Sequence, residues 1–381
     1  MDNTPREDDQ QLAACLRLAA VKLNNSCKQR LLEQYKNPQI IFETPLDEIK
    51  ALLLINSQPL RKAFNEINEA QIEQQLALLK HHKISTLLHH SDAYPQQLKQ
   101  IADAPAILFT RGDVQLLSGP QLAMVGSRNA SPSGLKTARD FAADFAATGL
   151  TVTSGLAAGI DTATHEGALN QIGRTIAVVA TGLDEVYPRS NLSLARSIVK
   201  KGCMISEFPP MTPARRAHFP QRNRLISGLS LGVLVVEADT RSGSLITARL
   251  AGEQGREIFA IPGSIHSPTS RGCHQLIRQG AKLVETTADV LLEIRTGLEI
   301  ELNLSTAKAH TNEIPAMADE NNLDPESINV LNQVDFAPTP LEDIAAHSNL
   351  AIELVLSKLL QLELAGKISP LPGGQYQKIQ N

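Results

Sequence analysis

The chain has 381 residues, 42% of them hydrophobic and 20% charged, with 36 Lys and Arg against 40 Asp and Glu. This length fits two to three domains, and the net charge of −4 excludes a polycation, so nucleic-acid binding would need a local patch. No apolar run approaches the ~20 residues of a membrane-spanning helix, the four cysteines include no C-x-x-C pair, and the polar start is no secretory signal. We therefore expect a cytoplasmic protein without membrane contact.

The first 85 residues carry apolar residues at helical spacing, such as Leu12, Leu16 and Ala19, and no alternating strand pattern. This indicates several short helices in one bundle. We therefore expect a small helical domain over residues 1–85.

Residues 86–296 alternate short β-rich apolar runs with amphipathic stretches, two of which are 135–147 and 162–169. Several runs are almost continuously apolar, as expected for strands buried on both faces of a parallel sheet. The pattern predicts an α/β fold, a doubly wound parallel sheet. The expected strands are 121–126, 151–155, 175–182, 231–239 and 257–263.

The end of the chain begins with an acidic stretch. Seven acidic residues and one basic residue, Lys308, lie between Glu301 and Asp335, and residues 297–320 are predicted to form a solvated linker. Residues 321–381 then follow the order of a winged-helix domain. The expected helices are 325–333, 340–347 and 350–364, and a hairpin is expected within 367–379.

Ligands of open α/β sheets bind outside the carboxyl ends of the strands. The first of these strands ends in Gly126-Ser127-Arg128, which offers an accessible backbone, a hydroxyl and a guanidinium suited to phosphate. A plain turn with an exposed arginine is the alternative. A dinucleotide site is disfavoured because the G-x-G-x-x-G pattern is absent.

Two further strand ends carry polar groups. After the second strand, Asp161 is a candidate helix cap, and His165 is interpreted as a packed residue rather than a catalyst. After the third strand, Arg189 is expected near the same rim of the sheet.

The densest segment is 215–224, in which four arginines, including Arg216, Arg222 and Arg224, flank Phe219. Guanidinium groups interleaved with a stacking ring suit single-strand binding without sequence preference. The alternative is a solvated basic helix end. Residues 205–282 hold ten basic and five acidic residues, which is a local positive patch.

The last candidate is Ser242-Gly243-Ser244, at the expected start of a helix. Two hydroxyls, a residue without Cβ and the helix dipole form an anion cradle. A simple serine cap is the alternative. The sequence contains no Walker loop, no spaced metal-ligand set and no G-x-S-x-G elbow, so we expect no catalytic residues, no metal and no cofactor.

These segments together resemble the DprA/Smf family of DNA-processing proteins of bacterial transformation. The resemblance covers about residues 90–295 in order and spacing. The motifs that carry it are Gly126-Ser127-Arg128, 154–165, 182–191, Ser206-Glu207-Phe208-Pro209-Pro210, Phe219-Pro220-Gln221-Arg222-Asn223-Arg224, 237–248 and Ile261-Pro262-Gly263.

The resemblance implies that the doubly wound sheet is an extended Rossmann-like domain that binds single-stranded DNA. It also implies a non-enzymatic, dimeric protein that protects this DNA and loads RecA onto it. It places Gly126, Ser127 and Arg128 in the DNA pocket and Arg189 and Arg216 at positions where basic residues meet phosphates. Phe219 would stack on a base, Arg222 and Arg224 would support the site, and Ser242, Gly243 and Ser244 would donate backbone hydrogen bonds.

The terminal domains resemble the family's sterile-alpha-motif-like or helix-hairpin-helix-like head and its winged-helix tail. The head has Asn56-Ser57-Gln58 where a helix-hairpin-helix has a glycine-rich turn, which speaks against DNA binding by the head.

Two other functions remain open at this point. A nucleotide phosphoribohydrolase shares a related Rossmann core, but its catalytic loop has no counterpart here, since no Glu follows Arg241 before Glu253. Alternatively, DNA could be bound chiefly by the winged helix, although residues 349–364 offer only Lys358 as a cation, against Glu353 and Glu363.

Overall fold

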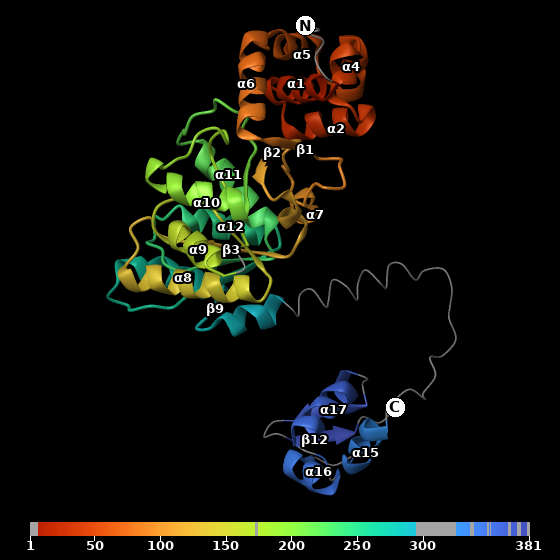
Figure 1. The fold of residues 1–381 in the computed structure, drawn as a ribbon, viewed down its shortest axis with the longest axis vertical. Helices are drawn as coiled ribbons and strands as arrows, with labels where there is room; N and C mark the ends of the chain where they lie inside the picture. Colours follow the sequence, from red (N-terminus) through yellow and green to blue (C-terminus); the bar gives the residue numbers. More distant parts are fainter. Residues whose placement is uncertain are drawn as a thin grey trace, which may run out of the picture. The chain divides into compact units, whose positions relative to one another are not determined.

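The computed structural model describes residues 7–171, 174–294, 325–335, 339–348, 350, 352–364, 367–371 and 375–378. The chain forms two compact units, Met1–Asn303 and Leu304–Asn381 (Figure 1). The linker predicted over 297–320 lies outside the described residues. Among the described residues, no helix is both long and apolar enough to cross a membrane.

The first unit begins with a helical bundle, as the sequence predicts. Three of its helices start at asparagines, Asn24, Asn37 and Asn68, whose side chains accept a hydrogen bond from a first-turn N–H. The six helices are α1 Glu7–Ala20, α2 Asn25–Tyr35, α3 Pro38–Glu43, α4 Leu46–Leu53, α5 Ser57–Asn65 and α6 Glu69–His82.

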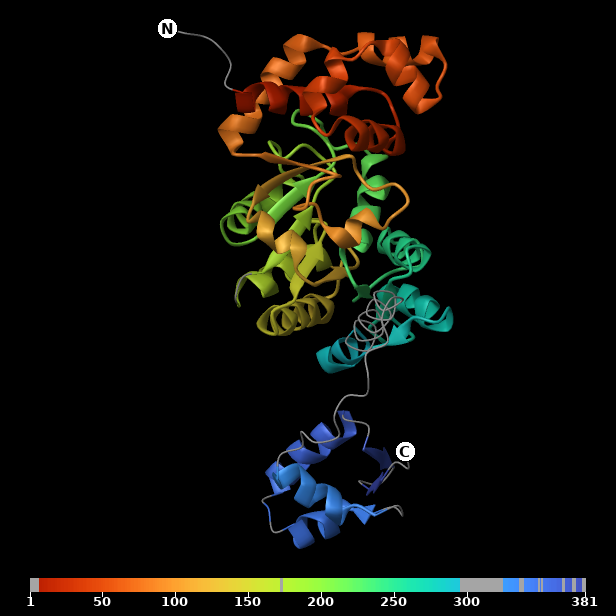
Figure 2. The same ribbon diagram turned by 90° about the vertical axis from the view of Figure 1, so that its right-hand side faces the viewer.

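The bundle has no core of its own. Its buried residues, such as Leu16 and Leu31, belong to one apolar cluster with Ile107 and Phe109 of the sheet. Figure 2 shows the helices lying beside the first two strands. The domain boundary expected at residue 85 falls at the first residue of β1 and stays a prediction.

A nine-stranded sheet with the order β1-β2-β6-β5-β4-β3-β7-β8-β9 forms the centre of this unit. The seven strands from β6 to β9 are parallel, whereas β1 and β2 are antiparallel to their neighbours. The strands are β1 Ser85–Leu88, β2 Ile107–Gly112, β3 Gln121–Val125, β4 Thr151–Ser154, β5 Thr175–Val178, β6 Cys203–Ser206, β7 Gly232–Val235, β8 Glu257–Ala260 and β9 Lys282–Leu283.

The Rossmann-like fold is confirmed, with one difference. All five predicted strands are present, but the sheet is mixed rather than wholly parallel, and β1, β2, β6 and β9 join it. Among these four, β9 has only two residues, and in β2 the polar Thr110 and Arg111 interrupt the apolar pattern.

Helices cover both faces of the sheet. Leu122 and Met124 of β3 lie in one cluster with α8 and α9, whereas Ala123 and Val125 face α11 and α12. The remaining helices of this unit include α7 and α13, on the α11 side, and α10, which contacts α9. The bounds are α7 Gln96–Lys99, α8 Pro132–Ala147, α9 Ile160–Leu169, α10 Leu192–Lys201, α11 His218–Leu229, α12 Ser244–Glu253 and α13 Arg271–Arg278.

The strand order reverses at β3. The chain proceeds from β3 through β4 and β5 to β6 on one side, and β7 lies on the other side of β3. The helix after β3 covers one face and the helix after β7 covers the opposite face, so the two connections diverge. Such a switch point leaves a crevice at the carboxyl ends of the strands.

The second unit is a winged helix. Helices α15 Pro325–Gln333, α16 Leu341–Ser348 and α17 Ile352–Leu364 agree with the predicted helices. Strands β10 Thr339–Pro340, β12 Gln375–Lys378 and β11 Ile368–Leu371 form a sheet in that order. Val330, Ile344 and Leu359 lie in its separate core.

Candidate nucleic-acid interface

A cleft of about 520 Å³ opens at the switch point between β3 and β7. Its walls are the loop after β3, the first turns of α11 and the connection from β7 to α12. Eight of the eleven site residues predicted from the sequence line it, namely Gly126, Ser127, Arg128, Phe219, Arg222, Ser242, Gly243 and Ser244.

The loop after β3 is hydrogen-bonded to the segment that follows β7. The backbone N–H of Ser127 donates to the Glu237 carbonyl at 2.7 Å, and the Ser127 hydroxyl accepts from the N–H of Asn129 at 3.1 Å. Ser131 caps α8 by accepting from the N–H of Gly134. These bonds fix the backbone from which the Arg128 side chain projects.

Two glycines, Gly126 in this loop and Gly159 before α9, allow close packing here. A Cβ on Gly126 would lie 2.6 Å from Ile160 Cγ1 and 2.9 Å from the Glu237 carbonyl, so close packing, and not only ligand access, requires glycine there. Gly159 adopts φ +79° and has the Ser127 carbonyl 2.3 Å from where a Cβ would be. The N–H of Ile160 then donates to that same carbonyl.

The guanidinium of Arg128 lies over the ring of Phe219, with 5.4 Å between Cζ and the ring centroid. The ring of Tyr187 contacts Phe219 as well, at 5.8 Å between centroids. Arg128, Tyr187 and Phe219 also line a smaller pocket of about 140 Å³ next to the cleft, which we call the inner pocket. Its other walls include Gly155, Ala157, Ala158, Ala180, Thr181, Pro188 and Arg222.

Two of the residues that line the cleft, Asp161 and Arg222, are buried charged groups. Burial raises the pKa of the Asp161 carboxyl, and the nearby Arg222 and the N–H of Ala157, a donor at 3.3 Å, oppose that shift. The sequence suggested Asp161 as a helix cap, but α9 begins at Ile160 with Gly159 at the cap position. His165 is packed as predicted, because it is fully buried and its Nδ1 lies 2.7 Å from the Thr175 hydroxyl.

The third wall is the start of α12. Gly243 occupies the cap position without a side-chain cap bond, and a Cβ there would meet no atom within 4 Å. The hydroxyls of Ser242 and Ser244 bond to each other at 2.7 Å. A ligand can therefore approach this backbone directly.

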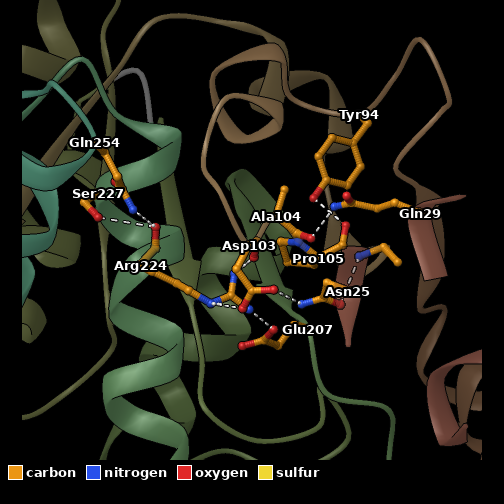
Figure 3. Close-up of polar contacts among 11 residues, drawn as sticks. Asn25, Gln29, Tyr94, Asp103, Ala104, Pro105, Glu207, Arg224, Ser227 and Gln254 are labelled. Atoms are coloured by element: carbon orange, nitrogen blue, oxygen red, sulfur yellow. Dashed lines mark hydrogen bonds and ion pairs between the residues drawn. The ribbon is translucent and has the colours of Figure 1, made fainter. Parts of the chain in front are cut away.

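Three predicted residues do not line the cleft. Arg189, in the turn after Pro188, and Arg216, just before α11, are exposed to solvent. Arg224 is on α11 but its guanidinium is engaged elsewhere (Figure 3). It pairs with Glu207 and donates to the Asp103 carbonyl at 2.5 Å.

The Arg224 contacts join the core to the helical bundle. Asp103 accepts from the amide of Asn25 on α2 at 3.0 Å, and Gln29 donates to the Ala104 carbonyl at 2.6 Å (Figure 3). Arg224 thus ties α11 to the segment against which the bundle lies.

Many residues that line the cleft or the inner pocket are not among the site residues predicted from the sequence, and four of them bear on ligand binding. Asn223, Asp239 and Arg241 line the cleft, and Tyr187 lines the inner pocket. The amide of Asn223 donates to the Gly243 carbonyl at 3.5 Å. Arg241 was visible only as the residue before the Ser-Gly-Ser segment. Across the described residues, no group of three or more His, Cys, Asp or Glu could hold a metal ion.

The fold defines an α/β protein of the Rossmann type with a cleft at the switch point of its sheet and a winged-helix unit. Residues 85–295 match the family model described as DNA recombination-mediator protein A, and residues 314–374 match the DprA winged helix domain. The chain belongs to the DprA/Smf family.

Its relatives agree with this assignment. Protein Smf of Escherichia coli is 43% identical over 304 residues, which cover 80% of each chain. The DNA processing protein DprA of Bacillus subtilis is 39% identical over 74% of this chain and 96% of its own.

Two solved structures are similar over most of their own length. DprA from Streptococcus pneumoniae has a TM-score of 0.66 and 39% identity, covering 74% of this chain and 97% of its own. DprA from Helicobacter pylori, described for its single-stranded DNA binding mode, has a TM-score of 0.52 and 29% identity, covering 57% and 97%.

Proposed function

We propose that this protein is a recombination mediator that binds single-stranded DNA in the cleft between β3 and β7, protects the strand and delivers it to RecA during transformation. The observation that carries the proposal is the pairing of Arg128 with Phe219 at the wall of that cleft. One residue supplies phosphate neutralisation and the other supplies a stacking surface. Membership of the DNA recombination-mediator family supports the same function.

Each site residue has a role in this proposal. Arg128 and Arg222 meet phosphates inside the cleft, and the exposed Arg189 and Arg216 meet them outside it. Phe219 stacks on a base. The Ser242–Ser244 segment approaches the strand through its backbone, with no Cβ on Gly243 in the way.

Such contacts carry little sequence information, because phosphates are the same along the strand and every base has a stacking face. We therefore expect weak sequence preference. Four arginines that each neutralise one phosphate give a slope of log affinity against log salt near about −3 for a single strand.

The test is a binding titration of the full chain with oligothymidylate and with duplex of the same length, across a range of salt concentrations. We expect tighter binding to the single strand, with the slope given above. Equal or tighter binding to the duplex would contradict the proposal.

Dimer formation and RecA delivery belong to the same proposal and rest on family membership. Light scattering of the purified chain measures whether it is a dimer. RecA delivery is measured by a strand-exchange assay in which RecA must act on DNA that is already coated by another single-strand binding protein. A monomer at all concentrations, or no stimulation of RecA, would contradict the corresponding part.

The hydrolase alternative has a direct test. Glu253, the first Glu after Arg241, lies at the end of α12 and pairs with Arg249 at the surface. Neither residue lines the cleft or the inner pocket. We expect no free base when the protein is incubated with nucleoside monophosphates, and release of base would revive that alternative.

A further inference from the structure

Arg222 is a buried cation beside the inner pocket. Its side chain on α11 is only 4% exposed, yet it lines both the cleft and the inner pocket. A Cβ on Gly155 would lie 1.6 Å from Nη1, so the guanidinium rests directly against the end of β4. Within the described part of the chain, nothing accepts a hydrogen bond from its Nε.

The charge around this group is unbalanced. Burial lowers the pKa of Arg222 to about 10, Asp161 opposes the shift, and Arg128 adds to it. Two guanidinium groups thus face one pocket, and the carboxylate of Asp161 compensates only one of them. A buried charge without full compensation is costly, and a ligand anion would offset that cost.

The Arg128 side chain also blocks the stacking surface. Atoms in van der Waals contact lie about 3.5–4.0 Å apart, so a base held between a guanidinium and a ring needs about 7 Å from one to the other. The observed separation is 5.4 Å. On its Arg128 face, the Phe219 ring can therefore accept a base only after Arg128 has moved.

We propose that the inner pocket is a phosphate subsite clamped by Arg222 and Arg128, and that the phosphate draws Arg128 off Phe219 and so exposes the ring to a base. This inference rests on the proposed function and adds to it an order of events. Capture of one phosphate precedes stacking of one base, and the two contacts are cooperative.

The first test uses the wild-type full chain and four short oligothymidylates of one length. Their backbone is either charged or made neutral by methylphosphonate linkages, and their bases are either present or removed. With the charged backbone, loss of the bases is expected to weaken binding on the order of tenfold, as for one lost stacking contact. With the neutral backbone, loss of the bases is expected to change nothing, because Arg128 still covers Phe219.

The outcome separates this inference from the function on which it rests. If the charged strand with bases does not bind, the proposed function fails. If it binds but base removal costs the same factor in both backbones, stacking is independent of phosphate and only the inference fails.

The second test identifies the clamp by competition with inorganic phosphate, against chloride at equal ionic strength. Phosphate is expected to displace oligothymidylate from the wild type and from Arg249→Gln, an exposed arginine of α12 outside the inner pocket. Arg222→Gln is expected to lose this competition. Competition that persists in a folded Arg222→Gln protein would overturn the assignment.

A further variant covers the case in which Arg222→Gln does not fold. Asp161→Asn keeps an acceptor for the N–H of Ala157 but removes the competing negative charge. Phosphate should then compete several-fold more strongly than in the wild type. If Arg222 serves only as the partner of Asp161, competition will be unchanged or weaker, which would refute the clamp.

Discussion

The carboxylate of Glu237 accepts two hydrogen bonds from Ser131, one from the backbone N–H at 2.9 Å and one from the hydroxyl at 2.5 Å. Glu237 follows β7 and Ser131 caps α8, so this contact joins the two connections that diverge at the switch point. The negative charge also lies at the positive end of the α8 dipole. The wall that carries Arg128 is therefore anchored to the wall that carries the Ser-Gly-Ser segment.

The first prediction concerns this anchor. Glu237→Gln removes the charge and one acceptor, and we expect the free energy of unfolding to fall by about 1–2 kcal/mol. The affinity for oligothymidylate should fall several-fold because the loop that presents Arg128 loosens. Urea unfolding and fluorescence anisotropy measure the two effects.

The matched control is Glu253→Gln on α12. Glu253 forms an exposed ion pair with Arg249, and such pairs contribute about 0–1 kcal/mol. We expect both stability and affinity to stay close to wild type. An equal loss in the two variants would show that Glu237 has no special role.

The sequence was sufficient for much of the fold because the central strands are rich in apolar and β-branched residues and end in glycine-bearing turns. β3, β4, β5, β7 and β8 could be predicted from local pattern alone. The antiparallel edge could not, because β1 and β2 mix apolar with polar residues, and the edge joins the sheet only where β2 pairs with β6, far along the chain. The location of the cleft could also be predicted, because ligands of open α/β sheets bind at the carboxyl ends of the strands, and the loops after β3 and β7 both lie at that edge.

The directions of side chains were less predictable. Arg222 and Arg224 both belong to the arginine-rich segment, but two residues along an α-helix are separated by about 200° around its axis. They therefore point to opposite sides, Arg222 to the cleft and Arg224 to Glu207. The partners of Arg224 come from residues remote in sequence, and no local pattern marks them.

The second prediction separates folding from binding at the start of α12. Gly243→Ala fits the folded protein, since no atom lies within 4 Å of the new Cβ and the backbone is helical. Stability should rise by about 0.4–1 kcal/mol. Affinity for oligothymidylate should nevertheless fall, because the Cβ occupies the space through which the strand approaches. Thermal unfolding and anisotropy are the measurements.

Gly126→Ala is the contrasting variant. Its Cβ would clash with Ile160 and the Glu237 carbonyl, so it should lose stability together with affinity. If Gly243→Ala binds DNA as tightly as the wild type, the backbone of α12 does not contact the strand.

The third prediction is that Arg224 supports the fold and not the DNA contact. Arg224→Gln leaves Glu207, whose side chain is only 12% exposed, without its ion-pair partner, and breaking a largely buried pair costs up to about 3–5 kcal/mol. The slope of log affinity against log salt should not change, because no phosphate contact is lost. Arg128→Ala should show the reverse, with little change in stability and a slope less steep by about 0.7. A flatter slope for a folded Arg224→Gln protein would place Arg224 at the strand.

The fourth prediction concerns pH. Burial lowers the pKa of Lys28 to about 8 from its ordinary value of 10.5, and Glu207 opposes the shift. Between these two values the unfolded chain binds more protons than the folded chain, so the wild type gains stability as the pH rises. Lys28→Met lacks this gain.

The comparison is made by chemical unfolding at several pH values. The unfolding free energy of the wild type minus that of Lys28→Met should be constant below pH ~8 and rise by about 1–3 kcal/mol toward pH ~10.5. Lys50→Met, at an exposed position of α4, is the control and should show no such rise. A flat difference for Lys28 would mean that its ammonium is as well solvated in the folded protein as in the unfolded one.

The fifth prediction assigns DNA binding to the first unit rather than to the winged helix. Lys358 is the single cation of α17, and its ammonium lies 3.3 Å from the Glu326 carboxylate of α15 with only 13% of the side chain exposed. Since this charge is already paired, α17 offers little to a phosphate backbone. A chain that ends at residue 303 should therefore bind oligothymidylate with an affinity within about two- to three-fold of that of the full chain, and with the same salt dependence.

The full-length variant Glu326→Gln tests the opposite possibility, that α17 contacts the DNA. Weakening the pair between Glu326 and Lys358 would then tighten DNA binding. Loss of binding on truncation, or a gain in Glu326→Gln, would move the DNA site to the winged helix.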